Sequence, residues 1–328
     1  MSMTADQIVD RRRLRRKLTF WRVVGFIAVI VVIAGAIAAV SGRSGRTLFP
    51  EPQIARVTVS GFIAEDRAEG EMLARLAKDS TVKGVIVAID STGGSTTGGE
   101  ALYESLRKLA DAKPTVATVG TFGASAAYMA AIATDHIVAR RTSLTGSIGV
   151  IFEYPEVSAL LDKLGVKVED IKSAPLKAEP NPFTPTSDEA RAVIQAIVAD
   201  TFGWFVGIVA ERRHLAHDQT LTLADGRIYT GQQALDTKLI DEIGGEDAAL
   251  VWLGTKGVDA KLPIKDWQPE RPGRGVFSLA GSALAWIAQA TGLGPSILPA
   301  AVLDRVMPES LKLDGLLSVW QGSSGGDK

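Results

Sequence analysis

Residues 82–128 read VKGVIVAIDSTGGSTTGGEALYESLRKLADAKPTVATVGTFGASAAY, and they carry the clearest structural pattern in the chain. Two apolar runs of strand length, Val82–Ile89 and Thr115–Val119, flank a helical pattern at Gly98–Ala110. A strand, a crossover helix and a second strand in this order are typical of parallel sheets covered by helices. The stretch therefore predicts an α/β fold.

The same alternation continues on both sides of this stretch. Further strands are predicted at Ile54–Val59, Ile137–Ala139 and Val166–Ile171, and further helices at Ala68–Lys78, Ser125–Thr134, Glu156–Leu164 and Ser187–Arg213. No fixed-period repeat stands out. We expect one α/β domain at residues 54–262, with parallel strands joined by right-handed crossovers.

The N-terminus combines a basic segment, residues 1–22, with an uncharged apolar run, residues 23–40 (VVGFIAVIVVIAGAIAAV). At a rise of about 1.5 Å per residue, the run spans roughly 27 Å, close to the hydrocarbon thickness of a bilayer. We predict a single transmembrane anchor with its basic flank in the cytoplasm and the domain on the other side. A cleaved signal peptide is the alternative, but its apolar region is usually only about 7–15 residues long. The adjacent arginines disfavour a buried soluble helix.

The regions flanking the predicted domain differ from it in composition. Residues 41–53 are polar, contain Gly and Pro, and predict a linker. Residues 263–328 are predicted to form a C-terminal extension. Within it, Phe277–Gln289 is too short for a second span and predicts a helix that packs on the domain, on another subunit or on the membrane surface. We expect the tail, Gly322–Lys328, to be mobile.

Composition disfavours or excludes several kinds of function. The 328 residues carry a formal net charge of −1, which gives no support for a nucleic-acid partner, and we expect none. The absence of Cys excludes disulfides, thiol catalysis and thiolate metal sites. Of the three histidines, His214 and His217 are spaced i, i+3 but no third ligand is evident beside them, so we expect neither a metal nor a cofactor.

Ser125 lies where a predicted strand passes into a helix. Its neighbours in residues 120–128 (GTFGASAAY) are mostly small and leave room for a substrate carbonyl. The N–H of Ala126 could donate a hydrogen bond to an oxyanion beside it. An ordinary helix N-cap serine is the alternative, and the motif alone does not separate the two.

A glycine turn, Ser91-Thr92-Gly93-Gly94, follows the strand at Val82–Ile89. Glycines let the backbone approach a ligand closely and point N–H groups at negative charge. A phosphate loop is not indicated, because no Lys follows Gly99 and the spacing is not G-x-G-x-x-G. The turn could instead hold the oxyanion of an acyl-transfer reaction, although a tight connection needs glycine in any case.

Lys177 is the candidate general base, at the end of residues 171–177 (IKSAPLK). Its neighbours Pro175, Leu176 and Ala178 are expected to surround it with apolar groups, and such burial lowers a lysine pKa toward the neutral amine. An ordinary solvated loop lysine is the alternative. Other lysines nearby are expected to be better placed for solvent: Lys163, Lys167 and Lys172.

The histidines offer a competing base. His136 opens a predicted strand behind the Ser125 helix, and a Ser125/His136 site remains an alternative, although a structural role is favoured. His214 and His217 lie among Arg and Glu residues and predict a solvated face.

Four blocks together resemble the bacterial signal peptide peptidase A family, over about Ile54 to Leu250. They are the glycine turn at 91–94, residues 123–128 (GASAAY), residues 144–150 (LTGSIGV) and residues 171–177. The chain departs from the family pattern at Thr92, where proline is usual, and at Ala126 and Ala127, where glycines are usual. These departures put the substrate preference in doubt more than the catalysis.

The resemblance implies an α/β fold of the Clp protease/crotonase type, built from repeated strand-strand-helix units and preceded by one transmembrane helix. It implies a serine endopeptidase in the bacterial inner membrane, with its catalytic domain extracytoplasmic, that degrades peptides such as remnant signal peptides. Ser125 would be the nucleophile, Lys177 the general base and Ser147 the residue that orients the lysine. The oxyanion would be held by N–H groups of Gly93, Gly94 and Ala126. A homo-oligomeric ring with sites shared between neighbouring subunits is also implied.

Three other functions stay open. The peptidase could serve general quality control of membrane proteins, or the chain could be a crotonase-like acyl-CoA enzyme or an inactive scaffold. The predicted anchor and the lack of a candidate acid/base carboxylate beside the glycine turn count against the acyl-CoA enzyme.

Overall fold

The computed structural model describes residues 21–27, 51–270 and 317–319. The chain divides into two units, residues 1–51 and 52–328, and each is described by itself. In the first unit, residues 21–27 are helical and exposed. Most of the predicted anchor, and the predicted helix at Phe277–Gln289, lie outside the described residues.

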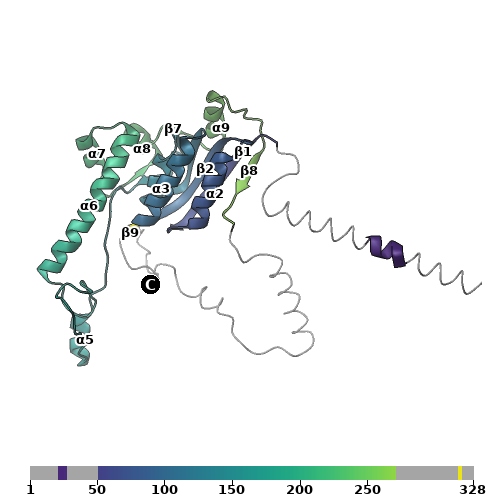
Figure 1. Cartoon of the computed structure of the whole chain (residues 1–328). Coiled ribbons are helices and arrows are strands. Elements are labelled where there is room, and N and C mark those ends of the chain that lie inside the picture. Colours follow the sequence, from purple (N-terminus) through teal and green to yellow (C-terminus); the bar gives the residue numbers. More distant parts are fainter. Residues whose placement is uncertain (1–20, 28–50, 271–316, 320–328) are drawn as a thin grey trace, which may run out of the picture. The chain divides into compact units, whose positions relative to one another are not determined.

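The second unit is built on one sheet (Figure 1). Its described strands are β1 (Gln53–Ile63), β2 (Val82–Ser95), β3 (Thr115–Ala124), β4 (His136–Ala139), β5 (Leu144–Gly146), β6 (Ile228–Thr230), β7 (Glu242–Ile243), β8 (Ile264–Trp267) and β9 (Leu317–Val319). The main order is β6-β5-β3-β2-β1-β8, while β4 and β7 continue from β3, and β9 pairs with β2. The strands β1, β2, β3 and β4 pair in parallel, which confirms the predicted α/β fold with a parallel sheet.

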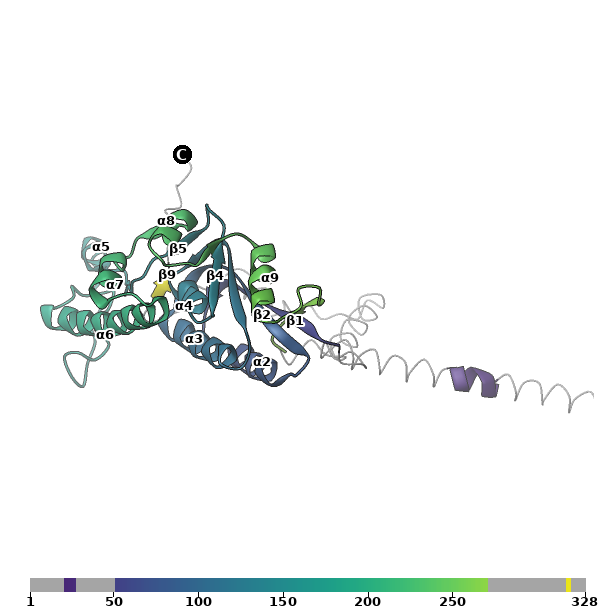
Figure 2. The same cartoon turned by 90° about the horizontal axis from the view of Figure 1, so that it is seen from above.

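Helices cover both faces of this sheet (Figure 2). They are α2 (Arg67–Lys78), α3 (Thr96–Ala110), α4 (Ala126–Ile132), α5 (Ser158–Leu164), α6 (Asp188–Arg213), α7 (His217–Leu223), α8 (Gly231–Asp236) and α9 (Glu246–Thr255). Polar side chains fix several helix starts: Asp66 accepts a hydrogen bond from the N–H of Ala68, and Ser187 accepts one from Ala190.

The two faces of the sheet have separate cores because successive strand residues point to opposite sides. Val85 and Val87 of β2 join the larger core, which includes α2, α3 and α4, whereas Ile86 joins a smaller core under α9. Every residue of α4 is at most 1% exposed. A helix that is apolar on all sides is stable only when it is enclosed, so α4 forms the centre of the domain.

Three sequence predictions differ from the structure. No strand forms at Val166–Ile171, where Val166, Val168 and Ile171 are exposed and lack a sheet neighbour within the described chain. β2 and β3 extend beyond the predicted runs into their glycine-rich ends. The sheet also continues past residue 262, since β8 pairs in parallel with β1.

Helix α6 is long and apolar enough to span a membrane by length and composition. Its C-terminal half instead packs in the domain core, where Phe205 and Val209 are fully buried. Arg212 Nε also donates a hydrogen bond of 2.9 Å to the Ile132 carbonyl at the end of α4. These contacts make α6 part of the folded domain.

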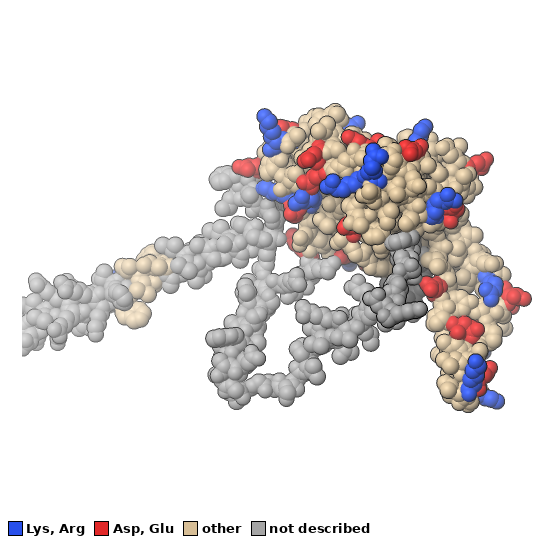
Figure 3. Space-filling model, turned by 180° about the vertical axis from the view of Figure 1, so that it is seen from behind, with Lys and Arg blue, Asp and Glu red and all other residues tan. Residues whose placement is uncertain are grey.

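The N-terminal half of α6 projects away from the sheet together with α5 (Figure 1). We call residues 158–200 the arm. The segment just before it is tied back to it by a hydrogen bond of 2.8 Å from the Val157 N–H to the Pro182 carbonyl. Acidic and basic side chains are interspersed over the body of the domain and occur along the arm as well (Figure 3).

Candidate active site

Ser125 follows the last residue of β3 and precedes α4, in a backbone conformation that serines rarely adopt. Its φ is +60° and its ψ is −121°, and its side chain does not cap the helix. Such strain costs on the order of 1–3 kcal/mol and tends to persist at functional sites. The Ser125 N–H is held by the Gly146 carbonyl at 2.8 Å. The N-cap alternative is therefore excluded, and a strained turn of the nucleophile type takes its place.

Ser147 lies beside Ser125 because of the strand register. Ala124 of β3 is paired with Gly146 of β5, and each serine is the next residue along its strand. Ser147 also has a positive φ, +48°, and its N–H donates to the Arg227 carbonyl at 2.8 Å. Ser125 is 1% exposed and Ser147 is 8% exposed. The strand register thus places two of the three predicted catalytic residues at the same end of the sheet.

The glycine turn reaches the same end of the sheet through β2. Ser91 of β2 is paired with Gly123 of β3, two residues before Ser125. Gly93 has a φ of +121°, and its N–H donates to the hydroxyl of Ser91 at 3.1 Å. That N–H is engaged in shaping the turn, which leaves the N–H groups of Gly94 and Ala126 as the candidate oxyanion donors.

Close packing explains two glycines of this region. A Cβ on Gly94 would come within 1.9 Å of the Ile63 carbonyl oxygen, so only glycine fits there. A Cβ on Gly99 would lie 3.0 Å from the Ala126 methyl group, which shows how closely α3 and α4 approach. Ala126 and Ala127 are both fully buried. Their methyl groups belong to the domain core, so the departures from the family glycines are accommodated by packing.

Lys177 is not brought to Ser125 within the chain. It lies in the connection between α5 and α6, on the arm, and it is exposed, as are Leu176 and Ala178. Its backbone N–H donates to Ala174, while its ammonium group has no hydrogen-bond or ion-pair partner among the described residues. The prediction that neighbouring apolar residues bury Lys177 is therefore wrong within a single chain.

Lys172, predicted to be solvated, is instead partly buried and paired with carboxylates of the arm. Its side chain is 16% exposed and lies 2.5 Å from a Glu179 carboxylate oxygen and 2.9 Å from Asp170. The hydrogen bond to Glu179, followed by that to Asp170, raises the pKa of Lys172, and Lys172 in turn lowers the pKa of Glu179. Lys172 is therefore a fixed cation that shapes the arm and is unsuited to act as a base.

His136 is excluded as the partner of Ser125. It is paired with Val116 of β3, nine residues before Ser125, a distance of roughly 30 Å along an extended strand. Its ring lies 3.2 Å from Glu242 and stacks on Trp252 with centroids 5.0 Å apart. Its role is structural, as favoured from the sequence, and His214 and His217 are exposed as predicted.

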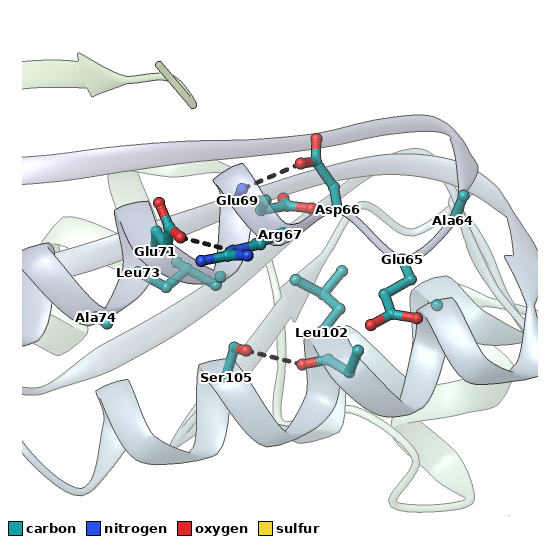
Figure 4. A pocket seen from close by; sticks show the side chains of 13 residues that line it. Ala64, Glu65, Asp66, Arg67, Glu69, Glu71, Leu73, Ala74, Leu102 and Ser105 are labelled. Atoms are coloured by element: carbon teal, nitrogen blue, oxygen red, sulfur yellow. Dashed lines mark hydrogen bonds and ion pairs between the residues drawn. The ribbon is translucent and has the colours of Figure 1, made fainter. Parts of the chain in front are cut away.

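A hollow between α2 and α3 is separate from this site (Figure 4). Three of the charged side chains that line it make local contacts: Asp66 caps α2, and Arg67 pairs with Glu71 at 2.8 Å. Neither Ser125 nor Lys177 lines the hollow.

Several residues of the site were missed at the sequence level. The Ser91 hydroxyl, which donates to the Gly61 carbonyl at 2.5 Å and accepts from Gly93, organises the glycine turn. Gly146, at a φ of +84°, provides the carbonyl that holds Ser125. Ser91 lies inside a block already recognised, so its place before two glycines was an available signal.

A strained serine at the end of a parallel strand, beside a glycine turn, is the arrangement typical of serine hydrolases. Comparison with known proteins agrees with this class of enzyme. The model of peptidase family S49 matches residues 107–260. A putative protease of Methanocaldococcus jannaschii is 36% identical over 242 residues, which cover 69% of this chain and 78% of that protein.

A putative signal peptide peptidase SppA of Enterococcus faecium is 33% identical over 213 residues, covering 60% of this chain and 62% of that protein. Among solved structures, a membrane-bound stomatin-specific protease matches with a TM-score of 0.44 at 12% identity, over 67% of this chain and 99% of that one. The chain belongs to peptidase family S49, the family of signal peptide peptidase A, and it is a serine peptidase.

Proposed function

We propose that the protein is a membrane-anchored serine endopeptidase in which Ser125 of one copy works with Lys177 of a neighbouring copy. The observation that carries the proposal is the backbone of Ser125, whose φ of +60° is maintained without helix capping. A role as the nucleophile would explain why this serine keeps a strained backbone without capping the helix.

The chemistry follows from the placement of the groups. Neutral Lys177 would take the proton of the Ser125 hydroxyl as Oγ bonds to the carbonyl carbon of a peptide. The N–H groups of Gly94 and Ala126 would hold the oxyanion. When the C–N bond breaks, the lysine returns the proton to the leaving amine, and water then hydrolyses the acyl-enzyme. Ser147, beside Ser125, would orient the lysine amine.

A second copy packed against the arm would account for the apolar side chains that the arm exposes. Large apolar side chains that are at least 38% exposed there are Leu160, Leu164, Val166, Val168, Ile171, Leu176, Phe183, Val193 and Ile197. A patch this extensive is typical of a protein interface. A neighbour that covers it would also remove water from around Lys177, and desolvation favours the neutral amine that a base requires.

The described N-terminal helix supports a membrane anchor. In residues 21–27, Trp21 is 69% exposed, Phe26 is 74% exposed and Ile27 is 55% exposed. Phe26 and Ile27 belong to the uncharged run of bilayer length, and Trp21 lies at the end of its basic flank. We propose that the basic segment stays in the cytoplasm and that the catalytic domain lies on the other side of the inner membrane.

Remnant signal peptides are the proposed substrates, since they are apolar peptides released at that membrane. The name of the Enterococcus relative supports this choice. Removal of other membrane peptides in quality control uses the same chemistry and is the second candidate.

Labelling with a serine-directed phosphonate tests the nucleophile. The purified full-length protein is treated with the reagent, digested, and the adduct is located by mass spectrometry. We expect the adduct on Ser125 and none in a Ser125→Ala variant. An adduct on another serine, or labelling that persists in the variant, would contradict the proposal.

A further inference from the structure

Strand β3 carries two more residues than its neighbour β2 shortly before its end. Ile89 of β2 is paired with Val119, and the next pair joins Ser91 to Gly123. Between these pairs β2 advances by two residues, from 89 to 91, while β3 advances by four, from 119 to 123. We call residues 120–122 the bulge. Bulges are over-represented beside active sites, where they re-aim a side chain.

The bulge sets the position of Ser125 relative to the glycine turn. In an unbroken register Ser91 would lie opposite Thr121, and Ser125 would lie two residues farther along. Two residues of extended chain span about 6.6 Å. Because the insertion is an even number of residues, the side chains of β3 keep their faces while Ser125 is drawn back toward Gly93 and Gly94. The geometry of the site therefore depends on the bulge.

Strand pairing alone does not hold the bulge. β3 pairs with β4 up to Val119, and its pairing with β5 begins at Phe122. Gly120 and Thr121 are thus left without a strand partner on either edge among the described strands. Backbone that lacks ladder hydrogen bonds is held less firmly, so side chains have to fix these residues.

Asp90 holds the bulge from the side of β2. The Phe122 N–H donates a hydrogen bond of 3.0 Å to the Asp90 carboxylate. The same side chain lies against Gly120, where an added Cβ would come within 3.3 Å of the Asp90 carboxyl carbon. Asp90 thus accepts the N–H that a regular ladder would pair with a backbone carbonyl.

Ser143 holds the bulge from the connection that leads into β5. Its hydroxyl donates to the Gly120 carbonyl at 2.5 Å and accepts from the Arg140 N–H at 3.0 Å. Ser143 is 2% exposed, so this contact is shielded from water. The next three residues form β5, whose Gly146 carbonyl holds the Ser125 N–H at 2.8 Å. Ser143 therefore joins the bulge to the strand that fixes Ser125.

We propose that Asp90 and Ser143 are positioning residues, which hold the bulge and thereby keep Ser125 in its strained conformation beside the glycine turn. The proposal rests on the proposed function, because it takes Ser125 to be the nucleophile. Both residues act on the reaction through the position of Ser125. Misplacing a reacting group by about 1 Å can lower a rate about a hundredfold. Loss of either hydrogen bond should therefore lower kcat and leave KM nearly unchanged.

Asp90 allows the cleaner test, because it is exposed and its replacement opens no cavity in the core. Asp90→Ala should lower kcat about tenfold, with KM within about twofold of wild type. Asp90→Asn keeps an oxygen that can accept the Phe122 N–H, and should retain kcat within about twofold. Wild-type kcat in Asp90→Ala would overturn the proposal. An equal loss in both variants would also overturn it, because the effect would then belong to the charge.

Ser143→Ala tests the buried contact, and it should lower kcat about tenfold or more at an unchanged KM. Ser105→Ala is the matched control. It removes another hydroxyl that donates to a backbone carbonyl, that of Ala101 at 2.8 Å within α3, and it should keep wild-type kcat. Equal kcat in the two variants would contradict the role of Ser143. If Ser143→Ala does not fold, the two Asp90 variants still decide the question.

A stability measurement separates this inference from the proposed function. Ser125→Gly should unfold at a higher temperature than Ser125→Ala, because glycine removes the strain. When Asp90→Ala is added to both variants the bulge can relax, so the difference in unfolding temperature should fall by about half or more. An unchanged difference would refute the proposal even if Ser125 is the nucleophile. A phosphonate adduct on another serine would refute the proposed function and leave this difference unaffected.

Discussion

The sheet end that carries Ser125 and the arm that carries Lys177 differ in what holds them. Around Ser125, strand pairing holds the backbone, as in the pairs Ala124 with Gly146 and Ser91 with Gly123. On the arm, Lys177 is exposed among apolar side chains that are exposed as well. Under the proposed function, a single chain would position the nucleophile, whereas the base would acquire its surroundings only when a second copy packs against the arm.

The largest effect is expected at the nucleophile. Ser125→Ala should lower kcat by about a thousandfold or more, because the group that forms the acyl-enzyme is lost. Peptide turnover under saturating substrate measures this loss.

Ser125→Gly offers a control for the strain at the same position. It should be as inactive as Ser125→Ala but unfold at a higher temperature, since glycine adopts a φ of +60° without strain. If Ser125→Gly unfolds at a lower temperature than Ser125→Ala, the backbone of residue 125 is not strained.

Lys177→Ala should lower kcat by roughly a hundredfold to ten thousandfold, the usual contribution of general acid–base catalysis. Lys167→Ala removes another exposed lysine of the arm and should leave kcat within about twofold. The comparison fails if both lysine variants lose activity equally, because that would indicate a general effect of charge on the arm.

A substitution can make the apolar surface of the arm polar without disturbing the fold of a single chain. Ile171 is fully exposed, so Ile171→Glu should leave the thermal unfolding of the domain nearly unchanged. If a neighbour covers this side chain, the buried charge should shift assembly toward single copies and lower activity about tenfold or more. Sedimentation velocity and turnover measure the two effects, and unchanged assembly with full activity would argue against an interface here.

The smallest expected effect concerns the ion pair of Lys172 and Glu179. Since Lys172 lowers the pKa of Glu179, the pair stabilises the arm above the unfolded carboxyl pKa, about 4.3, and that contribution is lost as pH falls through the lower folded value. Lys172→Ala should therefore be cleaved faster than wild type by a protease near pH 7. Digestion by an acid protease below about pH 4 should show a smaller difference, and a difference that grows with acidity would contradict the assignment.

The sequence predicted the sheet end well and the arm poorly, for a physical reason. Local patterns determine where β2 and β3 run and where Ser125 lies, because strand period and glycine placement act over a few residues. Whether Lys177 or Lys172 is solvated depends on Glu179 and on chain packing that no local pattern encodes. The apolar run at Val166–Ile171 predicts a strand, yet the described chain provides no neighbouring strand for it. β9 was missed for a similar reason, since three residues of Leu317–Val319 carry almost no pattern.

Mixing two inactive variants tests most directly whether the site is shared between copies. Ser125→Ala and Lys177→Ala chains are co-expressed in equal amounts, purified together, and assayed against each variant alone. If each Ser125 uses the Lys177 of a neighbour in a ring, about a quarter of the sites combine an intact serine with an intact lysine, and about a quarter of wild-type activity returns. Activity no higher than that of the separate variants would contradict the account.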